Sequence, residues 1–502
     1  MRRSRPMISR PMMSSHSGWL GALATLLALA GCNQTSDSAI KVQVIGAAGS
    51  PFEPGPRLPQ AAQLVRSATV EGLVGFDAQG RIIPALADRW IVTDDGQSYI
   101  FRLRDGTWPD ATPLSGETAA QTLRQAISAL QGTPMALDLS SIGEIRAMAG
   151  RVVEIRLSQP MPDLLQILAQ PELGLARKGK GAGPMSLVRQ GKLALLTPIA
   201  PERRGLPAIE GWQETMRPVH LTASSAAKAV SAFDQGEADL VLGGRIEDFP
   251  RASQTGLTRA AIRMDAVTGL FGLLVLHDDG FLGVTANREA LAMAVDREAL
   301  MAAFGLSGWA PSTRLVPGGV SDAANTSTGA ERWSDLAMAQ RQAQARTQVE
   351  RWTAGKPPPT LRLDLPDGPG GDILFERLST DMQAIGIKAV RVRGADDADL
   401  RMMDVVARYP RVSWFLNQLS CTNLRGPCSR KADLLAAAVP ATAEPAGKAV
   451  LLERAQEQLE AANVFIPFGA PVRWSLVSGG VSGFSANRWG LHPLMPMATR
   501  PK

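Results

Sequence analysis

Short alternating segments recur along this chain and predict strands. Apolar and polar side chains alternate over residues 41–45, and the mainly apolar segment Ala238-Asp-Leu-Val-Leu242 predicts a buried strand. Such alternation leaves one face of a strand buried and the other exposed. Further strands of the alternating kind are predicted at 98–104, 152–157, 361–365 and 388–392.

Segments with helical periodicity separate these strands. Residues 287–304 carry Leu291, Ala294 and Val295 on one face, so Arg288, Glu289, Arg297 and Glu298 are expected outside. Alternation of strands with helices favours α/β lobes rather than a helical bundle. The other helices are predicted at 117–130, 222–235, 335–354, 372–385 and 447–462.

The N-terminal segment has the pattern of a secretory signal. Residues 1–18 are basic and polar, and residues 19–31 form an apolar run of 13 residues. A helix that spans a bilayer needs about 20 residues, so this run is too short. A basic start, a short apolar core and small residues before Cys32 predict export, with a chance match at a signal anchor as the alternative.

The basic leader changes the meaning of the net charge. The chain has a formal charge of +6 at pH 7, and the loss of Arg2, Arg3, Arg5 and Arg10 lowers this to +2. No basic run interleaved with aromatic residues follows. A nucleic-acid partner is therefore excluded, because such a partner requires a concentrated positive surface.

Two cysteines follow Cys32, namely Cys421 and Cys428. In an oxidising compartment we expect a disulfide that closes a small loop. A metal-binding pair is the alternative, although no further Cys or His lies nearby to complete a site.

The sequence lacks the motifs of the common hydrolases and nucleotide-binding proteins. No G-x-S-x-G elbow, H-E-x-x-H helix or phosphate-binding loop is present. His220, His277 and His492 are widely spaced in sequence. We therefore predict that the chain is not an enzyme and holds neither a cofactor nor a metal.

Two sets of residues resemble known families. Leu29-Ala-Gly-Cys32 resembles the lipobox of bacterial lipoproteins, which implies cleavage before Cys32 and lipid attachment to its sulfur. Residues 71–80, 83–90 and 94–106 resemble the recognisable block of bacterial extracellular solute-binding protein family 5, the oligopeptide, dipeptide and nickel binders of ABC importers. Further similar segments follow in the family's order at Asp110-Ala-Thr-Pro113, Gly181-Ala-Gly-Pro184, Gly236-Glu-Ala-Asp239, 287–297 and 381–387.

The family resemblance, over residues 40–490, implies a two-lobed periplasmic-binding-protein clamshell of class II type with an extra subdomain. We expect a monomer that encloses a small solute, peptide-like or otherwise polar, and delivers it to ABC permease and ATPase subunits. It would be periplasmic and anchored to the inner or outer membrane through Cys32. The expected segments are 1–31 as signal peptide, 32–39 as tether, 40–70 with 184–262 and 475–502 as lobe I, 71–183 as extra subdomain, and 263–474 as lobe II.

The expected ligand residues depart from the dipeptide-binding pattern. Dipeptide-type relatives place an aspartate for the peptide ammonium where this chain has Arg408 or Arg411, and an arginine for the carboxylate near Leu365. Arginine cannot accept a hydrogen bond from an ammonium group. We therefore expect an anionic or neutral polar end of the ligand at Arg408. The alternative is that Arg408 and Arg411 are solvated loop residues. The complete set of predicted ligand residues is Phe52, Glu53, His277, Trp309, Asp367, Arg408, Tyr409 and Trp414.

The altered ligand motif also admits a second function class. A lipoprotein of the same fold can serve as a ligand sensor or as a chaperone-like surface protein without transport. Neighbouring genes for two permease and two ATPase subunits would favour transport, whereas a neighbouring sensor kinase would favour sensing.

Overall fold

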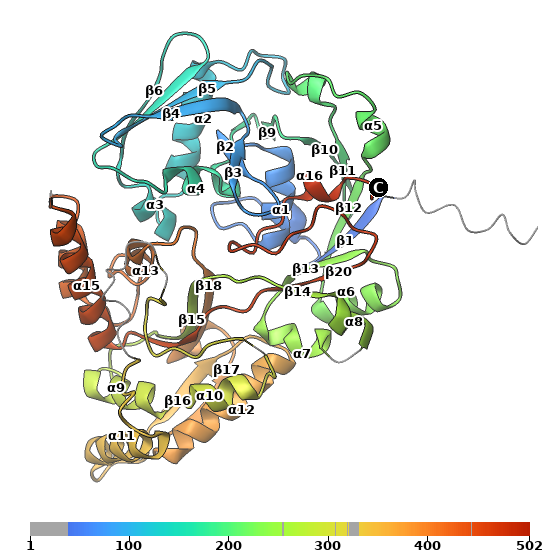
Figure 1. Ribbon diagram of the computed structural model, residues 1–502. Helices are drawn as coiled ribbons and strands as arrows, with labels where there is room; N and C mark the ends of the chain where they lie inside the picture. Colours follow the sequence, from blue (N-terminus) through green and yellow to red (C-terminus); the bar gives the residue numbers. More distant parts are fainter. Residues whose placement is uncertain are drawn as a thin grey trace, which may run out of the picture. The chain divides into compact units, whose positions relative to one another are not determined.

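The computed structural model describes residues 39–253, 256–306, 308–318, 320, 331–442 and 444–501. The predicted signal peptide, most of the tether and the lipidation site at Cys32 lie outside these residues. Of the helices described, none is long and apolar enough to cross a membrane. The mixed order of strands and helices in Figure 1 confirms the predicted α/β class.

The large sheet has the strand order β10-β11-β12-β1-β13-β20-β14. Its strand β1 pairs in parallel with β12 and β13, and its alternate residues Ile40, Val42 and Val44 are buried as predicted. Helix α1 (Gln60–Thr69) contacts β1 and β10, and α6 (Ala226–Asp234) contacts β1 and β13. The strands are β1 (Ile40–Ile45), β10 (Met185–Gln190), β11 (Leu193–Pro198), β12 (Val219–Ser224), β13 (Leu240–Gly244), β14 (Ile262–Met264) and β20 (Trp474–Val477).

The second sheet has the order β17-β16-β18-β15-β19. Strand β15 lies between β18 and β19, and a side-chain carbon at its Gly272 would lie 2.1 Å from the carbonyl oxygen of Ile466, so only glycine fits there. Helix α12 (Pro369–Ala384) packs against β17. The strands are β15 (Gly269–Val275), β16 (Thr360–Asp364), β17 (Lys388–Val392), β18 (Leu400–Val406) and β19 (Phe465–Gly469).

The small sheet is antiparallel, with the order β4-β5-β7-β6, and helix α2 (Gly116–Ala129) contacts its strands β6 and β7. Ser115 caps α2 by accepting a hydrogen bond from the backbone N–H of Thr118, as expected for a serine before a helix. The strands are β4 (Ala87–Val92), β5 (Ser98–Leu103), β6 (Ile142–Ala147) and β7 (Val152–Leu157); β2 (Val74–Phe76) pairs with β3 (Ile82–Pro84), and β8 (Ala176–Arg177) with β9 (Lys180–Gly181).

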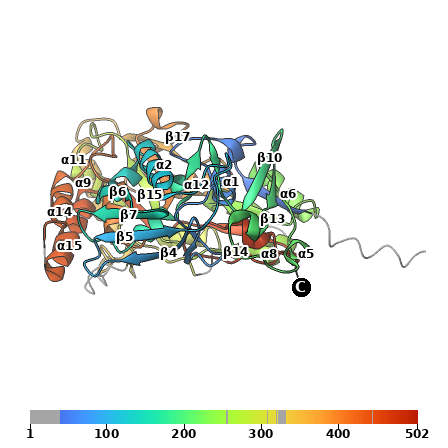
Figure 2. The same cartoon turned by 90° about the horizontal axis from the view of Figure 1, so that it is seen from above.

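The remaining helices surround the sheets. In Figure 2 α14 and α15 lie side by side at one end of the view, and α5 and β10 lie toward the other. The helices are α3 (Pro134–Asp138), α4 (Leu164–Leu168), α5 (Trp212–Thr215), α7 (Phe249–Ala252), α8 (Gly256–Ala261), α9 (Thr285–Ala294), α10 (Arg297–Ala302), α11 (Met338–Thr353), α13 (Val412–Gln418), α14 (Arg430–Ala438), α15 (Pro445–Ala462) and α16 (Leu494–Met497); short 3-10 turns are η1 (Ser50–Phe52), η2 (Pro171–Leu173), η3 (Pro201–Arg204), η4 (Ile246–Asp248) and η6 (Ala395–Asp397).

The helix predicted over residues 287–304 is two helices, α9 and α10. The chain breaks at Asp296, whose carboxylate accepts a hydrogen bond from the backbone N–H of Ala299 and starts α10. The expectation that Arg288 and Arg297 lie outside was wrong, because both are buried. Their guanidinium groups donate to backbone carbonyls, including those of Ala462 and Pro467, and burial lowers the pKa of Arg297 to about 9.

Two short segments carry the described chain between the large and the second sheet. Residues 265–268 join β14 to β15, and residues 470–473 join β19 to β20. These crossings are hydrogen-bonded to each other, because the N–H of Asp265 donates to the carbonyl oxygen of Arg473 at 3.0 Å. The division into the predicted lobes and extra subdomain stays a prediction.

The predicted disulfide is confirmed, since Cys421 and Cys428 are bonded and close a loop between α13 and α14. The carboxylate of Asp433 in α14 accepts a hydrogen bond from the backbone N–H of Cys421, which attaches this loop to the helix. The disulfide therefore holds the start of α14 close to the end of α13.

Loss of the disulfide should destabilise the protein. We expect the double variant Cys421→Ser/Cys428→Ser to lower the free energy of unfolding by about 2–3 kcal/mol, because the short loop no longer restricts the unfolded chain. Urea unfolding of both proteins, with and without reductant, measures this. Reductant should weaken only the unsubstituted protein, and equal stability of the two oxidised proteins would contradict the prediction.

Candidate functional site

A cavity of about 660 Å³, called the cleft here, lies between the large and the second sheet. The large sheet's side contributes η4, Arg473 and the C-terminal loop, and the second sheet contributes β18 and the end of β16. Both apolar and charged side chains line it, and sites for small molecules also combine the two kinds. The lining residues are Leu58, Pro59, Gln60, Gln63, Gln170, Arg245, Ile246, Glu247, Leu274, Asp364, Leu365, Pro366, 401–408, Arg473 and 489–491.

Strand β18 borders the cleft with a partly open edge. All of β18 pairs with β15 on one side. On its other side β16 pairs only with Leu400 and Arg401, because β16 ends at Asp364. Residues 402–406 thus have one strand partner among the described residues, and all five line the cleft. An open strand edge offers backbone donors and acceptors to an extended ligand.

An ion pair joins the crossing between the sheets to β18. Arg473 donates through Nη1 to both carboxylate oxygens of Asp404, at 2.8 and 2.9 Å. Both side chains are only 8% exposed, and burial lowers the pKa of Arg473 while Asp404 opposes this. The guanidinium of Arg245 lies 4.0 Å from the same carboxylate and is 44% exposed, so it faces the cleft as a freer cation.

A second carboxylate, that of Glu247, lines the same part of the cleft. Burial raises the pKa of Glu247, and the neighbouring charge of Asp404 raises it further. A carboxyl group with a raised pKa takes up a proton more readily and becomes a hydrogen-bond donor. This wall therefore contains both charged and protonatable groups.

Arg408 lies where β18 leaves the cleft and is held by a buried carboxylate. Its guanidinium donates to both oxygens of Glu172 at 2.9 and 3.0 Å and to the amide oxygen of Gln170 at 3.1 Å. The side chain of Arg408 is 28% exposed, whereas that of Glu172 is 1% exposed. The exposed member of the pair is thus the guanidinium, which has donors and no acceptor.

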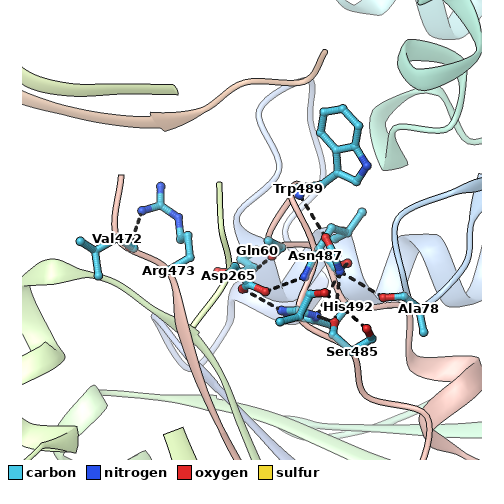
Figure 3. A network of polar contacts seen from close by, with 12 residues as sticks. Gln60, Ala78, Asp265, Val472, Arg473, Ser485, Asn487, Trp489 and His492 are labelled. Atoms are coloured by element: carbon cyan, nitrogen blue, oxygen red, sulfur yellow. Dashed lines mark hydrogen bonds and ion pairs between the residues drawn. The ribbon is translucent and has the colours of Figure 1, made fainter. Parts of the chain in front are cut away.

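The C-terminal loop positions an aromatic side chain at the cleft (Figure 3). Trp489 lines the cleft, and its indole N–H donates to the carbonyl oxygen of Gly80 at 2.8 Å. The loop is attached to the crossing segment, because Asn487 N–H donates to Asp265 at 2.9 Å and buried His492 lies 3.1 Å from the other oxygen of Asp265. One network therefore connects the crossing with a cleft wall.

Of the eight predicted ligand residues, the structure places Arg408 in the cleft lining. Tyr409 is buried and donates its hydroxyl to Asp138 at 2.8 Å, and Trp414 is buried against Phe415. Trp414 lies in the core, whereas Tyr409 lines another cavity, beside Asp138. Their contact with a ligand stays a prediction.

The other five predicted residues lie apart from the cleft lining. Phe52 packs under the guanidinium of Arg189, and the neighbouring Glu53 is exposed. His277 is half-buried in the loop after β15. Trp309 donates to the carbonyl oxygen of Ala470 at 2.8 Å and lines a different cavity, while the exposed Asp367 pairs with Arg393.

Sequence reasoning missed the charged residues that line the cleft beside Arg408. Arg473 and Asp404 are 69 positions apart, so no local motif could reveal their contact. An available signal was the single carboxylate within the apolar run of residues 402–407, because an isolated charge in such a run requires a partner. Among the described residues there is no group of three or more His, Cys, Asp or Glu side chains arranged to hold a metal ion.

Comparison with known proteins shows that one segment of the chain is similar to a known protein family. Residues 81–187 match the family described as bacterial extracellular solute-binding proteins, family 5 Middle. The probable deoxycholate-binding periplasmic protein YgiS of Escherichia coli is 28% identical over 338 residues, which are 60% of this chain. The chain thus spans 62% of the length of that relative. The nickel-binding periplasmic protein of Escherichia coli is 30% identical over 107 residues, covering 21% of this chain and 20% of that protein.

Solved structures share the fold over most of the chain. Haemophilus influenzae OppA in complex with the peptide RPPGFSPFR has a TM-score of 0.77 and 17% identity, covering 93% of this chain and all of that one. The Escherichia coli murein tripeptide binding protein MppA has a TM-score of 0.78 and 15% identity, with 93% and 99% coverage. These similarities confirm the predicted class II periplasmic-binding-protein fold. The chain thus combines a segment similar to family 5 of the bacterial extracellular solute-binding proteins with the fold of OppA and MppA.

Proposed function

We propose that this protein is the solute-binding subunit of a peptide-type ABC importer. It captures a small solute in the cleft and delivers it to the permease and ATPase subunits. The observation that carries the proposal is the open edge of β18, residues 402–406, within a cavity of about 660 Å³. A volume of this order suits a small molecule or a short peptide-like chain.

The two crossing segments support a mechanism of closure. They are short, adjacent and hydrogen-bonded to each other, which is the arrangement of a hinge. Rotation about them would change the distance between η4 and β18, the two sides of the cleft. A ligand that contacts both sides would favour the closed form by its differential affinity.

The cargo is proposed to present a hydrogen-bond acceptor at the Arg408 end of β18. Its guanidinium still has N–H groups beyond those used by Glu172 and Gln170, and the carboxylate of Glu172 is buried behind it. A carboxylate or acyl carbonyl would pair with these donors, whereas an ammonium group would find no acceptor. An extended, peptide-like solute with an uncharged or anionic end fits this geometry.

The relatives support a small solute without identifying it. Their names specify deoxycholate, glutathione and nickel, which differ in charge, size and polarity. Family membership is therefore compatible with cargo other than free peptides. Deoxycholate in particular is a carboxylate on a large apolar body, and the cleft of this chain combines arginines with the side chains of Met402, Met403 and Val405.

Lipid attachment at Cys32 completes the proposal. Residues 29–32 resemble a lipobox, and β1 begins at Ile40, which leaves a short tether between anchor and fold. Anchoring would keep the cleft close to a permease in the membrane. Metabolic labelling with a fatty acid, compared between the unsubstituted protein and Cys32→Ser, tests this part separately.

Native purification should recover the cargo. We expect mass spectrometry of the purified full-length protein to detect a solute below about 1 kDa, because the cleft is of small-molecule size. The released solute should bind again to the emptied protein in a calorimetric titration. Failure of every released compound to rebind would contradict the proposed role as a solute receptor.

Filling the cleft should abolish capture without unfolding the protein. Met403→Trp places a larger side chain at the open edge, and we expect the affinity for the recovered solute to fall about tenfold or more because of the clash. Titration calorimetry measures the affinity. Leu187→Trp on the exposed side of β10 is the matched control and should leave the affinity unchanged. Equal affinity of both variants would place the ligand elsewhere.

Removal of the Arg408 pair should weaken binding of an acceptor-ended ligand. The double variant Arg408→Ala/Glu172→Gln avoids leaving a buried carboxylate unpaired, and we expect about a tenfold or greater loss of affinity. The matched double variant Arg411→Ala/Asp163→Asn removes a neighbouring ion pair outside the cleft and should change affinity little. N-acetyl-Leu-Leu should also bind more tightly than free Leu-Leu. Unchanged affinity in the first variant would disprove the role of Arg408.

A further inference from the structure

A second cavity, of about 780 Å³, lies beside the cleft and has no lining residue in common with it. Helix α3 and the loop at residues 159–163 form one side, and helices α13, α14 and α15 form the other. Much of its surface is apolar, with Met161, Leu416 and Leu452 among the lining side chains. It is therefore suited to the apolar part of a small molecule.

Asp138, the last residue of α3, provides a buried carboxylate in this cavity. The residue is 3% exposed, and its Oδ1 accepts hydrogen bonds from the hydroxyl of Tyr409 at 2.8 Å and from the amide of Asn417 at 2.9 Å. Its Oδ2 has no hydrogen-bond partner among the described residues, and neither has the hydroxyl of Ser420, which also lines the cavity. Buried polar atoms are rarely left without a partner, so two of them at one cavity indicate a missing donor.

The charges around the cavity determine what that donor can be. The ionisable lining residues are Asp138, Asp163 and Asp433 against Arg411 and Lys448, which leaves an excess of one carboxylate. Arg411 is already paired with Asp163, and Asp433 accepts the backbone N–H of Cys421. Asp138 accepts hydrogen bonds from the neutral Tyr409 and Asn417 and forms no ion pair with the described residues.

The protonation of Asp138 is consistent with a missing cation. Burial raises its pKa to about 6, against the lowering effects of Asn417, Tyr409 and the more distant Arg408. Above this pH the ionised carboxylate is only half satisfied by hydrogen bonds. A cationic N–H donor at Oδ2 would both complete its hydrogen bonding and offset its charge.

We propose that this cavity binds a small organic cation, an amine with an apolar substituent, whose ammonium group donates to Asp138 Oδ2 with Ser420 as a second acceptor. The apolar substituent packs among Met161, Leu416 and Leu452. This site is separate from the solute cleft. Its occupant bridges α3 and α13, which belong to different parts of the fold.

Titration calorimetry of the purified full-length protein at pH 7.5 tests this site with benzylamine and benzyl alcohol. Benzylamine should bind at one site, and the uncharged alcohol should bind about tenfold more weakly or not at all, because a charged donor makes the stronger hydrogen bond. Asp138→Asn should reduce benzylamine affinity about tenfold or more. Glu247→Gln, which alters a carboxylate of the cleft, is the matched control and should change it less than about twofold.

Two results would overturn the proposal. One is loss of benzylamine binding in Glu247→Gln but not in Asp138→Asn, which would place the amine in the cleft. The other is equal affinity for amine and alcohol, which would show that binding does not depend on a cationic donor at Asp138. Neither result bears on Met403→Trp or on the recovered solute, so the two proposals fail independently.

The release of protons on benzylamine binding tests the same site without any variant protein. Because the pKa of Asp138 is raised to about 6, amine binding at pH 6 should release about half a proton from its carboxyl group. Binding enthalpies in phosphate and in imidazole buffer, which differ in ionisation enthalpy, report this release. Benzylamine affinity should also be about tenfold lower at pH 5 than at pH 7.5. A binding enthalpy independent of buffer, with affinity independent of pH, would overturn the site even if Asp138→Asn does not fold.

Discussion

The buried ion pair between Arg473 and Asp404 links the proposed hinge of this protein to the cleft proposed to bind its ligand. Arg473 ends the crossing that leads into β20, and Asp404 lies in the middle of β18. Each charge would be costly to bury alone, so each requires the other where the two sheets meet. The pair therefore holds the crossing against β18 and places Arg245 and Glu247 opposite the open strand edge.

Both the cleft and the second cavity contain a partly satisfied charged side chain, but the cleft presents hydrogen-bond donors and the second cavity presents an acceptor. At Arg408 the carboxylate partner is buried and the guanidinium remains partly exposed, so the cleft presents donors. At Asp138 the donors Tyr409 and Asn417 occupy one oxygen and the other remains an acceptor. Residues 408–417 reach both places, since Arg408 lines the first cavity and Tyr409 the second. A single loop and helix thus separate the cleft, proposed to bind an acceptor, from the second cavity, proposed to bind a donor.

Local sequence patterns predicted much of the fold but misplaced several charges. The strands near 41–45, 98–104 and 361–365 follow from alternation, because burial on one face of a sheet imposes a period of two. The helix at 287–304 was predicted without its break, and Arg288 and Arg297 were expected at the surface. Periodicity identifies a polar face, but it does not show that backbone carbonyls of β19 and α15 approach that face and accept its hydrogen bonds.

The sequence by itself determined the α/β class, the resemblance to family 5 and the Cys421–Cys428 disulfide, since each depends on residues that are close together in the chain. It also indicated Arg408, whose contact with a ligand stays a proposal. Only the tertiary structure decided what surrounds Arg408, because Glu172 lies 236 positions away. It likewise brought Arg473 to Asp404, Asp138 to Tyr409 and Trp489 to the cleft wall. Charge compensation in a buried site is set by distance in space, and the order of residues along the chain carries little information about that distance.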